Sequence, residues 1–233
     1  MRDCITLAAV GDVALTDYLR KFIYDFGPMW PFEPCRPALQ ADLLFGNLEC
    51  IIFRPPWPDQ PPNGETFHVA WPEALGLAEA GFSVLAMANN HVLDYGPERA
   101  FQTIEFCRDH NIATVGFGRD PAAARRAAIL ERRGIRVGFL AYVEDVPGLR
   151  RQVSPGPAYI AEQNIRQDIA DLRRAGTDIV VVSLHADLEF ADHPAPLRVA
   201  LSRRLIDAGA TVLLQHHPHV PQRSEERRVG KEC

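Results

Sequence analysis

Short apolar runs of strand length recur along the chain, and most are separated by segments with helical periodicity. The runs lie at 5–10, 43–45, 82–88, 112–115, 127–130, 135–142, 179–184 and 211–214. Helical patterns lie at 71–80, 97–110, 162–175 and 196–208. Strands that alternate with helices indicate parallel strands joined by crossover helices. The sequence therefore predicts an α/β fold.

Two segments do not follow this alternation of strands and helices. The runs at 127–130 and 135–142 are separated by a short polar stretch that contains Gly134, which predicts a hairpin and hence a mixed sheet. We therefore expect a layered α/β domain in which a mixed sheet is flanked by helices. The segment 54–64 contains five prolines and cannot pair in a central strand. It is expected to be an exposed loop, either a lid over a site or a passive surface segment.

Length and charge limit the class of protein. A chain of 233 residues suits one large domain. The net charge of −5, without a basic stripe, argues against nucleic acid as a partner and favours a small molecule or a protein. No apolar run approaches the length of a membrane span or a secretory signal, so we expect a cytoplasmic protein unless the native start lies upstream. Five cysteines without a C-x-x-C pair predict reduced thiols, with neither a disulfide framework nor a thiolate zinc site.

The last eleven residues, 223–233, break from the preceding pattern. They resemble an in-frame translation of a sequencing-adapter oligonucleotide, although an ordinary charged tail is the alternative. We expect a domain over residues 1–222 that is truncated at its C-terminus, followed by a non-native tail.

Polar side chains gather where the predicted strands end. Asp12, Glu49 and the run Asn89-Asn90-His91 follow the first three strands, and four further histidines follow the last two: His185, His216, His217 and His219. A single aspartate or histidine in such a place is more often a cap or a structural residue. The carboxyl edge of a parallel sheet is, however, where ligands bind in α/β proteins. Carboxylate, amide and imidazole donors without a thiolate suit one or two divalent ions, namely Mn, Fe, Zn or Mg.

The order of these motifs resembles the CapA family of capsule or poly-gamma-glutamate biosynthesis proteins. The matching pieces are Gly11-Asp12, Asn47-Leu48-Glu49, Ala88-Asn89-Asn90-His91 with Asp94-Tyr95-Gly96, His185, and His216-His217-Pro218-His219-Val220. The match extends from about residue 7 to residue 222. The family is similar in fold to calcineurin-like metallophosphoesterases, which implies a layered metallophosphoesterase-like domain with two sheets packed together and flanked by helices.

The resemblance also implies roles for single residues. Asp12 would bind one metal, Glu49 would bridge two metals, and Asn90 would bind the second. His185, His217 and His219 would complete the coordination. His91 would protonate a leaving group or stabilise negative charge on the substrate, and Asp94 would orient His91. His216 either supports the loop or binds a metal directly, and both roles stay open.

Three departures from the family pattern bear on function. Ala14 stands where the phosphoesterases usually carry a histidine, Gln215 replaces a glycine, and only Glu189 matches the segment after His185. Asp187 and His193 either contact the substrate or lie in a solvated loop, and both alternatives stay open. The favoured hypothesis is a metal-dependent hydrolase acting on a phosphoester or related bond. The alternatives are a non-catalytic assembly or export factor for an anionic polymer, which the absent histidine favours, and an amide-bond hydrolase or ligase.

Overall fold

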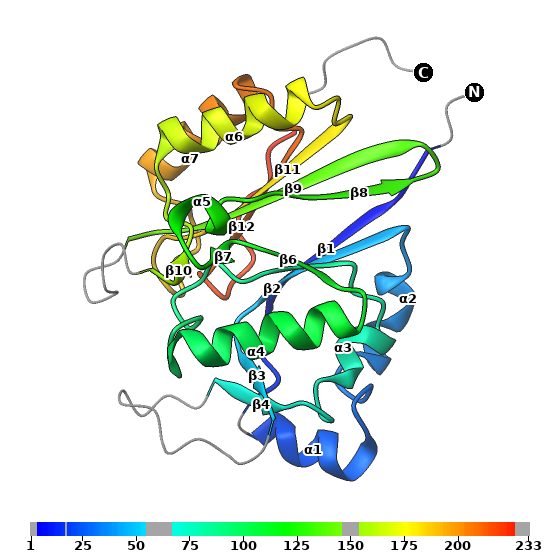
Figure 1. Cartoon of the computed structure of the whole chain (residues 1–233). Coiled ribbons are helices and arrows are strands. Elements are labelled where there is room, and N and C mark those ends of the chain that lie inside the picture. Colours follow the sequence, from blue (N-terminus) through cyan, green and yellow to red (C-terminus); the bar gives the residue numbers. More distant parts are fainter. Residues whose placement is uncertain (1–3, 17, 55–66, 146–153, 227–233) are drawn as a thin grey trace.

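The computed structural model describes residues 4–16, 18–54, 67–145 and 154–226. Two four-stranded sheets lie face to face in the middle of the molecule, and helices cover the outer face of each (Figure 1). The four layers therefore run helix, sheet, sheet, helix. This confirms the layered α/β fold with two packed sheets that the sequence predicted.

The first sheet is parallel throughout, in the order β1-β2-β5-β6. Its strands are β1 (Leu7–Val13), β2 (Leu43–Leu48), β5 (Val84–Ala86) and β6 (Ala113–Val115). The helical elements beside it are α1 (Tyr18–Phe26), η1 (Glu33–Cys35), α2 (Arg36–Leu39), α3 (Leu75–Glu79) and α4 (Gly96–Asp109). Buried side chains from these helices, among them Ile23, Leu77 and Phe106, form one core cluster with Leu44 and Leu85 of the sheet.

The second sheet is mixed, in the order β12-β11-β9-β8. Its strands are β8 (Ala128–Arg132), β9 (Ile135–Val143), β11 (Ile179–His185) and β12 (Val212–His216), and α6 (Glu162–Arg174) and α7 (Pro196–Asp207) cover its outer face. Strands β8 and β9 form the predicted hairpin. Its two-residue turn has positive φ at Arg133 (51°) and Gly134 (75°), the geometry that matches the twist of the flanking strands.

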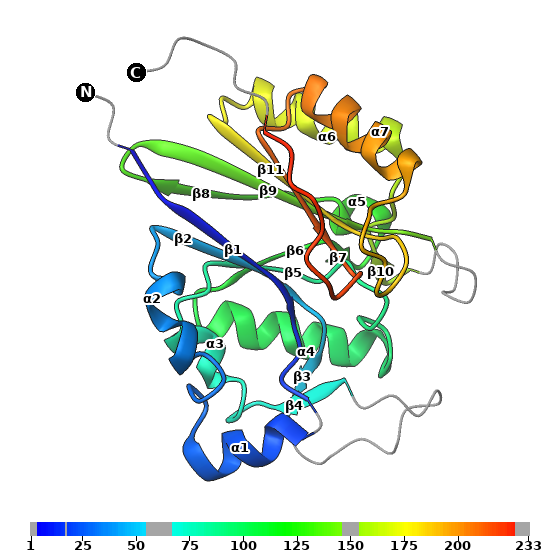
Figure 2. The same cartoon turned by 180° about the vertical axis from the view of Figure 1, so that it is seen from behind.

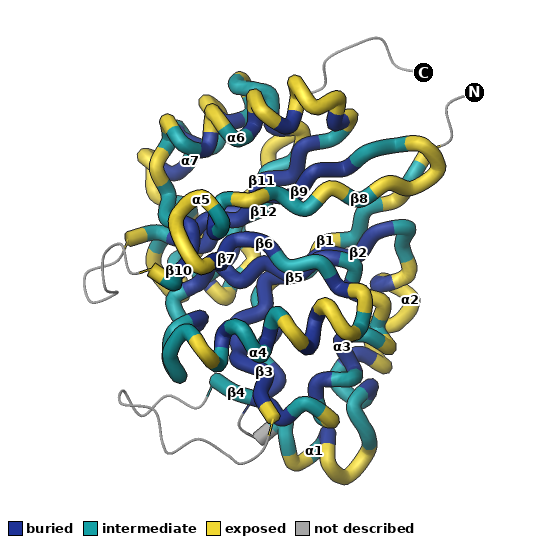
Figure 3. Tube along the Cα trace, in the orientation of Figure 1, coloured by how far each residue is buried: buried dark blue, intermediate teal, exposed yellow. Residues whose placement is uncertain are grey.

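The interior between the sheets is apolar. The rings of Phe45 on β2 and Phe139 on β9 stack with centroids 5.8 Å apart, and Val84, Val137 and Val181 belong to the same buried cluster. Figure 3 shows the inner strands β2, β5, β9 and β11 as mostly buried, with exposed positions on the edge strand β8 and recurring along the covering helices. Burial of these inner strands on both faces explains why they read as mostly apolar runs in the sequence.

Several short elements complete the described part of the chain. They are β3 (Ile51–Phe53), β4 (His68–Ala70), β7 (Phe117–Gly118), β10 (Gly156–Pro157) and α5 (Pro121–Ala124). Of the predicted helices, the one at 71–80 is shorter than expected, because α3 begins only at Leu75. The proline-rich loop lies almost entirely outside the described residues. Among the residues that are described, every helix is too short or too polar to span a bilayer.

Candidate metal centre at the carboxyl edge of both sheets

The predicted site residues come from both sheets and meet at one edge. Asp12 lies in β1 and Glu49 directly follows β2, whereas His185 and His216 are the last residues of β11 and β12. The view from behind shows β1 and the segment around β12 side by side (Figure 2). The parallel strands of the two sheets thus deliver their carboxyl ends to a common place.

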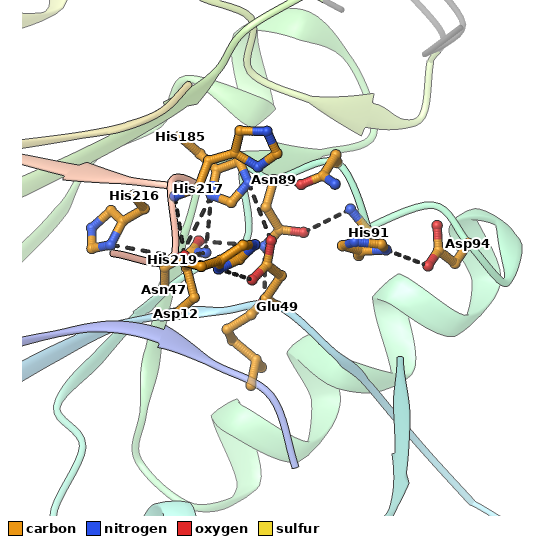
Figure 4. A network of polar contacts seen from close by, with 12 residues as sticks. Asp12, Asn47, Glu49, Asn89, His91, Asp94, His185, His216, His217 and His219 are labelled. Atoms are coloured by element: carbon orange, nitrogen blue, oxygen red, sulfur yellow. Dashed lines mark hydrogen bonds and ion pairs between the residues drawn. The ribbon is translucent and has the colours of Figure 1, made fainter. Parts of the chain in front are cut away.

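Glu49 lies at the centre of the cluster (Figure 4). Its Oε1 is 3.3 Å from Nε2 of His185, and its Oε2 is 3.9 Å from Nδ1 of His219. Donor atoms of Asp12, Glu49 and His185 all lie within 4.8 Å of one another, as do those of Glu49, His217 and His219. Two possible cation positions therefore share Glu49, the residue that the resemblance placed as a bridge.

The remaining predicted ligands adjoin these two groups. Nδ1 of His219 lies 3.0 Å from Oδ2 of Asp12, and the same oxygen accepts a hydrogen bond from the backbone N–H of His217 at 3.1 Å. Oδ1 of Asn90 lies 2.7 Å from Nε2 of His185. All six residues predicted to bind metal are thus brought together, while their role as ligands stays a prediction.

Buried polar atoms without a hydrogen-bond partner concentrate at this edge. Seven such side-chain atoms occur in the described part of the chain, and four belong to the cluster: Glu49 Oε1, His217 Nδ1 and both ring nitrogens of His216. An unsatisfied buried polar atom costs about 1–3 kcal/mol and is often explained by an ion or a water molecule. The oxygen and imidazole donors fit Mn, Fe, Zn or Mg.

Burial shifts the protonation of the cluster toward neutral side chains. It raises the pKa of Glu49 to about 7, and the neighbouring charge of Asp12 adds to this rise. Burial also lowers the pKa of His185 and of His216 to about 4, and lowers that of His217. Near neutral pH the three imidazoles are therefore uncharged and keep a lone pair for a cation.

His91 lies beside the cluster, on the side of Glu49 away from His216 (Figure 4). Its Nδ1 is 2.7 Å from Oδ2 of Asp94, the contact that the sequence analysis predicted. The imidazole also stacks on the ring of Phe67, with centroids 3.9 Å apart. These contacts fix both the plane and the direction of the ring, and the catalytic role of His91 stays a prediction.

Two buried amides beside the ligands were not predicted as site residues. Nδ2 of Asn47 donates to Oδ1 of Asp12 at 2.7 Å and lies 3.1 Å from Nδ1 of His185. Oδ1 of Asn89 accepts the backbone N–H of His91 at 3.1 Å. Both residues stand inside motifs that the sequence analysis singled out, but only register and packing show that their side chains face the ligands.

Asp187 and His193, whose roles the sequence leaves open, lie in different surroundings. Asp187 forms an ion pair with the buried Arg198 at 3.7 Å, and Arg198 also pairs with Glu144 at 2.7 Å. Asp187 is therefore an anchored residue and not part of a solvated loop. His193 is exposed, and Ala14, at the position of the absent histidine, has no side-chain donor.

The four-layer fold and the oxygen and imidazole donors at its carboxyl edge define an α/β domain with a candidate metal centre. The family model described as bacterial capsule synthesis protein PGA_cap matches residues 6–231, and the chain belongs to this family. The resemblance to CapA proteins is thereby confirmed.

The chain is similar to several curated relatives. It is 27% identical over 234 residues to the capsule biosynthesis protein CapA of Bacillus anthracis, covering 97% of this chain and 57% of the relative. It is 36% identical over 212 residues to a probable polyglutamine synthesis accessory protein of Mycobacterium tuberculosis, covering 83% of this chain and 54% of that protein. The chain thus spans little more than half the length of these relatives.

A solved structure shares the fold. A hypothetical protein from Thermus thermophilus superposes with a TM-score of 0.56 at 17% identity, covering 95% of this chain and 71% of that one. At this level of identity the likeness shows the fold alone.

Proposed function

We propose that this chain is the metal-binding part of a hydrolase that acts in capsule or poly-gamma-glutamate biosynthesis and cleaves a phosphoester or related bond. One observation carries the proposal. Glu49 and five further residues with oxygen or nitrogen donors converge from the two sheets and their connections, with the His91–Asp94 pair beside them. An edge built in this way combines cation binding with proton transfer.

Each group of residues has a separate task. Asp12 and His185 form one group of donors with Glu49, and His217 and His219 form the other, so that two divalent cations would be held with Glu49 shared between them. Asn90 adjoins His185. When bound, such cations lower the pKa of a water molecule toward about 7 and draw charge from the bond under attack. The protein supplies the arrangement of donors and buries Glu49 and His185 among them.

His91 is placed to move a proton. Asp94 accepts the hydrogen bond from Nδ1 of His91, which leaves Nε2 as the atom that gives a proton to the departing oxygen. Stacking on Phe67 keeps the ring plane fixed during this transfer. The carboxylate of Asp94 also stabilises the charged form of His91.

A metal analysis combined with one substitution tests the proposal. The purified chain is expected to retain one or two equivalents of Mn, Fe, Zn or Mg. His91→Ala is expected to lower kcat for a chromogenic phosphoester by about 100- to 10,000-fold while the metal content stays unchanged. His110→Ala is the matched control, because His110 bonds the backbone carbonyl of Phe106 at 2.8 Å within α4. Equal activity of the two variants would contradict the role of His91.

A second candidate function is assembly or export of an anionic polymer without catalysis. Ala14 favours it, because this side chain cannot supply the ligand that a histidine would give to the first cation. The Mycobacterium relative is named as a probable accessory protein of polyglutamine synthesis. Absence of turnover with any of the four metals, together with metal-dependent binding of polyglutamate, would favour this candidate over hydrolysis. An amide-bond substrate is tested in the same assay with a gamma-glutamyl anilide.

A further inference from the structure

The side chain of Asn47 lies between the two sheets, at the back of the candidate metal centre. Asn47 is fully buried, and its register partner on β1 is Asp12. Its amide nitrogen donates to Oδ1 of Asp12 at 2.7 Å and lies 3.1 Å from Nδ1 of His185. One neutral group therefore contacts two predicted ligands, one from each sheet.

The other end of the same amide leads toward His91. Oδ1 of Asn47 accepts a hydrogen bond from Nδ2 of Asn89 at 3.4 Å, and Nδ2 of Asn89 also donates to the backbone carbonyl of Leu48 at 2.7 Å. Oδ1 of Asn89 then accepts the backbone N–H of His91 at 3.1 Å. Two buried amides thus form a continuous chain of hydrogen bonds from Asp12 and His185 to His91 (Figure 4).

Packing alone does not explain why the amide of Asn47 is buried at this position. Burying an amide costs free energy unless its hydrogen bonds are made, and an apolar side chain of similar volume fills a buried strand position at lower cost. The side chain of Asn47 contacts Asp12 and His185 of the site and the supporting amide of Asn89. In a buried environment such a network is strong and restricts each member to one orientation.

We propose that Asn47 is the positioning residue of the metal centre. It holds Asp12 and His185 in a fixed relation across the two sheets, and Asn89 extends this constraint to His91. The inference rests on the proposed function, because it assigns Asn47 a task toward the cation that those ligands hold. Hydrogen-bond partners of metal ligands typically contribute about 10- to 100-fold to affinity.

The test compares cation affinity in three proteins: wild type, Asn47→Leu and Thr103→Val. Thr103 is also fully buried, and its hydroxyl accepts the backbone N–H of Ile52 at 2.8 Å, away from the predicted ligands. Zn²⁺ affinity is measured by competition with a chromophoric chelator, and the ligand field is followed by visible absorption of the Co²⁺-loaded protein. We expect Asn47→Leu to weaken Zn²⁺ binding by at least about 10-fold and to shift the Co²⁺ bands. Thr103→Val is expected to lower the melting temperature without either effect.

The outcomes separate this inference from the proposed function. Zn²⁺ binding by wild type and by folded Asn47→Leu with equal affinity would overturn the inference and leave the proposed function standing. Absence of Zn²⁺ and Co²⁺ binding by wild type would overturn both. If the leucine variant does not fold, Asn47→Ala decides, since its methyl group fits where the amide fits, and the same loss of affinity is expected.

Discussion

The charge of Glu49 depends on what surrounds it. Its side chain is 1% exposed, and Asp12 contributes a second negative charge nearby. With the pKa raised to about 7, a proton and a divalent cation compete for the same carboxylate at neutral pH. Glu49 is therefore costly to the fold when it is ionised alone and useful when a cation neutralises it.

This predicts a pH-dependent effect of Glu49→Gln in the presence of a chelator. Because the folded pKa exceeds the ordinary 4.5, the stability that depends on neutral Glu49 is complete below about pH 4.5 and is lost as the pH rises through about 7. Without metal, Glu49→Gln is expected to be more stable than wild type at pH 8 by up to about 3 kcal/mol, and by much less at pH 5. Urea unfolding at both pH values measures the difference.

Saturating Mn²⁺ or Zn²⁺ supplies the control for this comparison. The cation neutralises Glu49, so that wild type is then expected to be the more stable protein at pH 8. His185 and His216 are present in both proteins, so their own titration cancels. A glutamine variant that is less stable than wild type at pH 8 in chelator would show that Glu49 does not carry a buried charge.

At the level of elements, the sequence predicts which segments form strands, but it does not predict the residues at which some of them end. All eight predicted strands exist, and β2, β5, β9 and β11 are apolar because they are buried along most of their length. Strand β2 nevertheless extends from Leu43 to Leu48, beyond the predicted 43–45, since Gly46 and Asn47 interrupt the apolar run. Polar residues that serve the site therefore shorten the strands that a periodicity analysis detects.

The missed elements have two different causes. Helix α1 carries Leu19, Phe22 and Ile23 at helical spacing, a signal that was present and not used. The two-residue strands β7 and β10 exist only because they pair with each other, so local sequence does not specify them. The same holds for the contact of Asn47 with Asp12, which depends on the register between β1 and β2.

Gly116 follows β6 and lies close to Ala88, which follows β5, and to Ala141 on β9. Its φ is +93°, and a Cβ added there would lie 2.6 Å from Cβ of Ala88 and 3.0 Å from Cβ of Ala141. Gly116→Ala is expected to cost about 3 kcal/mol or more, because overpacking adds to the cost of a left-handed backbone. Gly81→Ala is the matched control, since Gly81 has φ +90° with nothing within 4 Å, and it is expected to cost about 1–2 kcal/mol. Equal losses in denaturant unfolding would exclude the steric contribution.

For the whole molecule, the candidate metal centre is the place where polar groups of the two halves meet. Asp12, Glu49 and Asn90 belong to the first sheet and its connections, while His185, His217 and His219 belong to the second. Elsewhere between the sheets the contacts include the apolar cluster around Phe45 and Phe139. A cation held by both sets of donors would cross-link the sheets.

Cation binding is therefore expected to stabilise both sheets together. A ligand that binds only the folded state adds about 2.7 kcal/mol at 100 times its dissociation constant. Amide hydrogen exchange with and without saturating Zn²⁺ is expected to slow in β2 of the first sheet and in β11 of the second by a similar factor. Slower exchange in β11 and β12 alone would mean that the histidines bind the cation without Asp12 and Glu49. In that case, the shared site at the common edge would be wrong even if the metal content were as predicted.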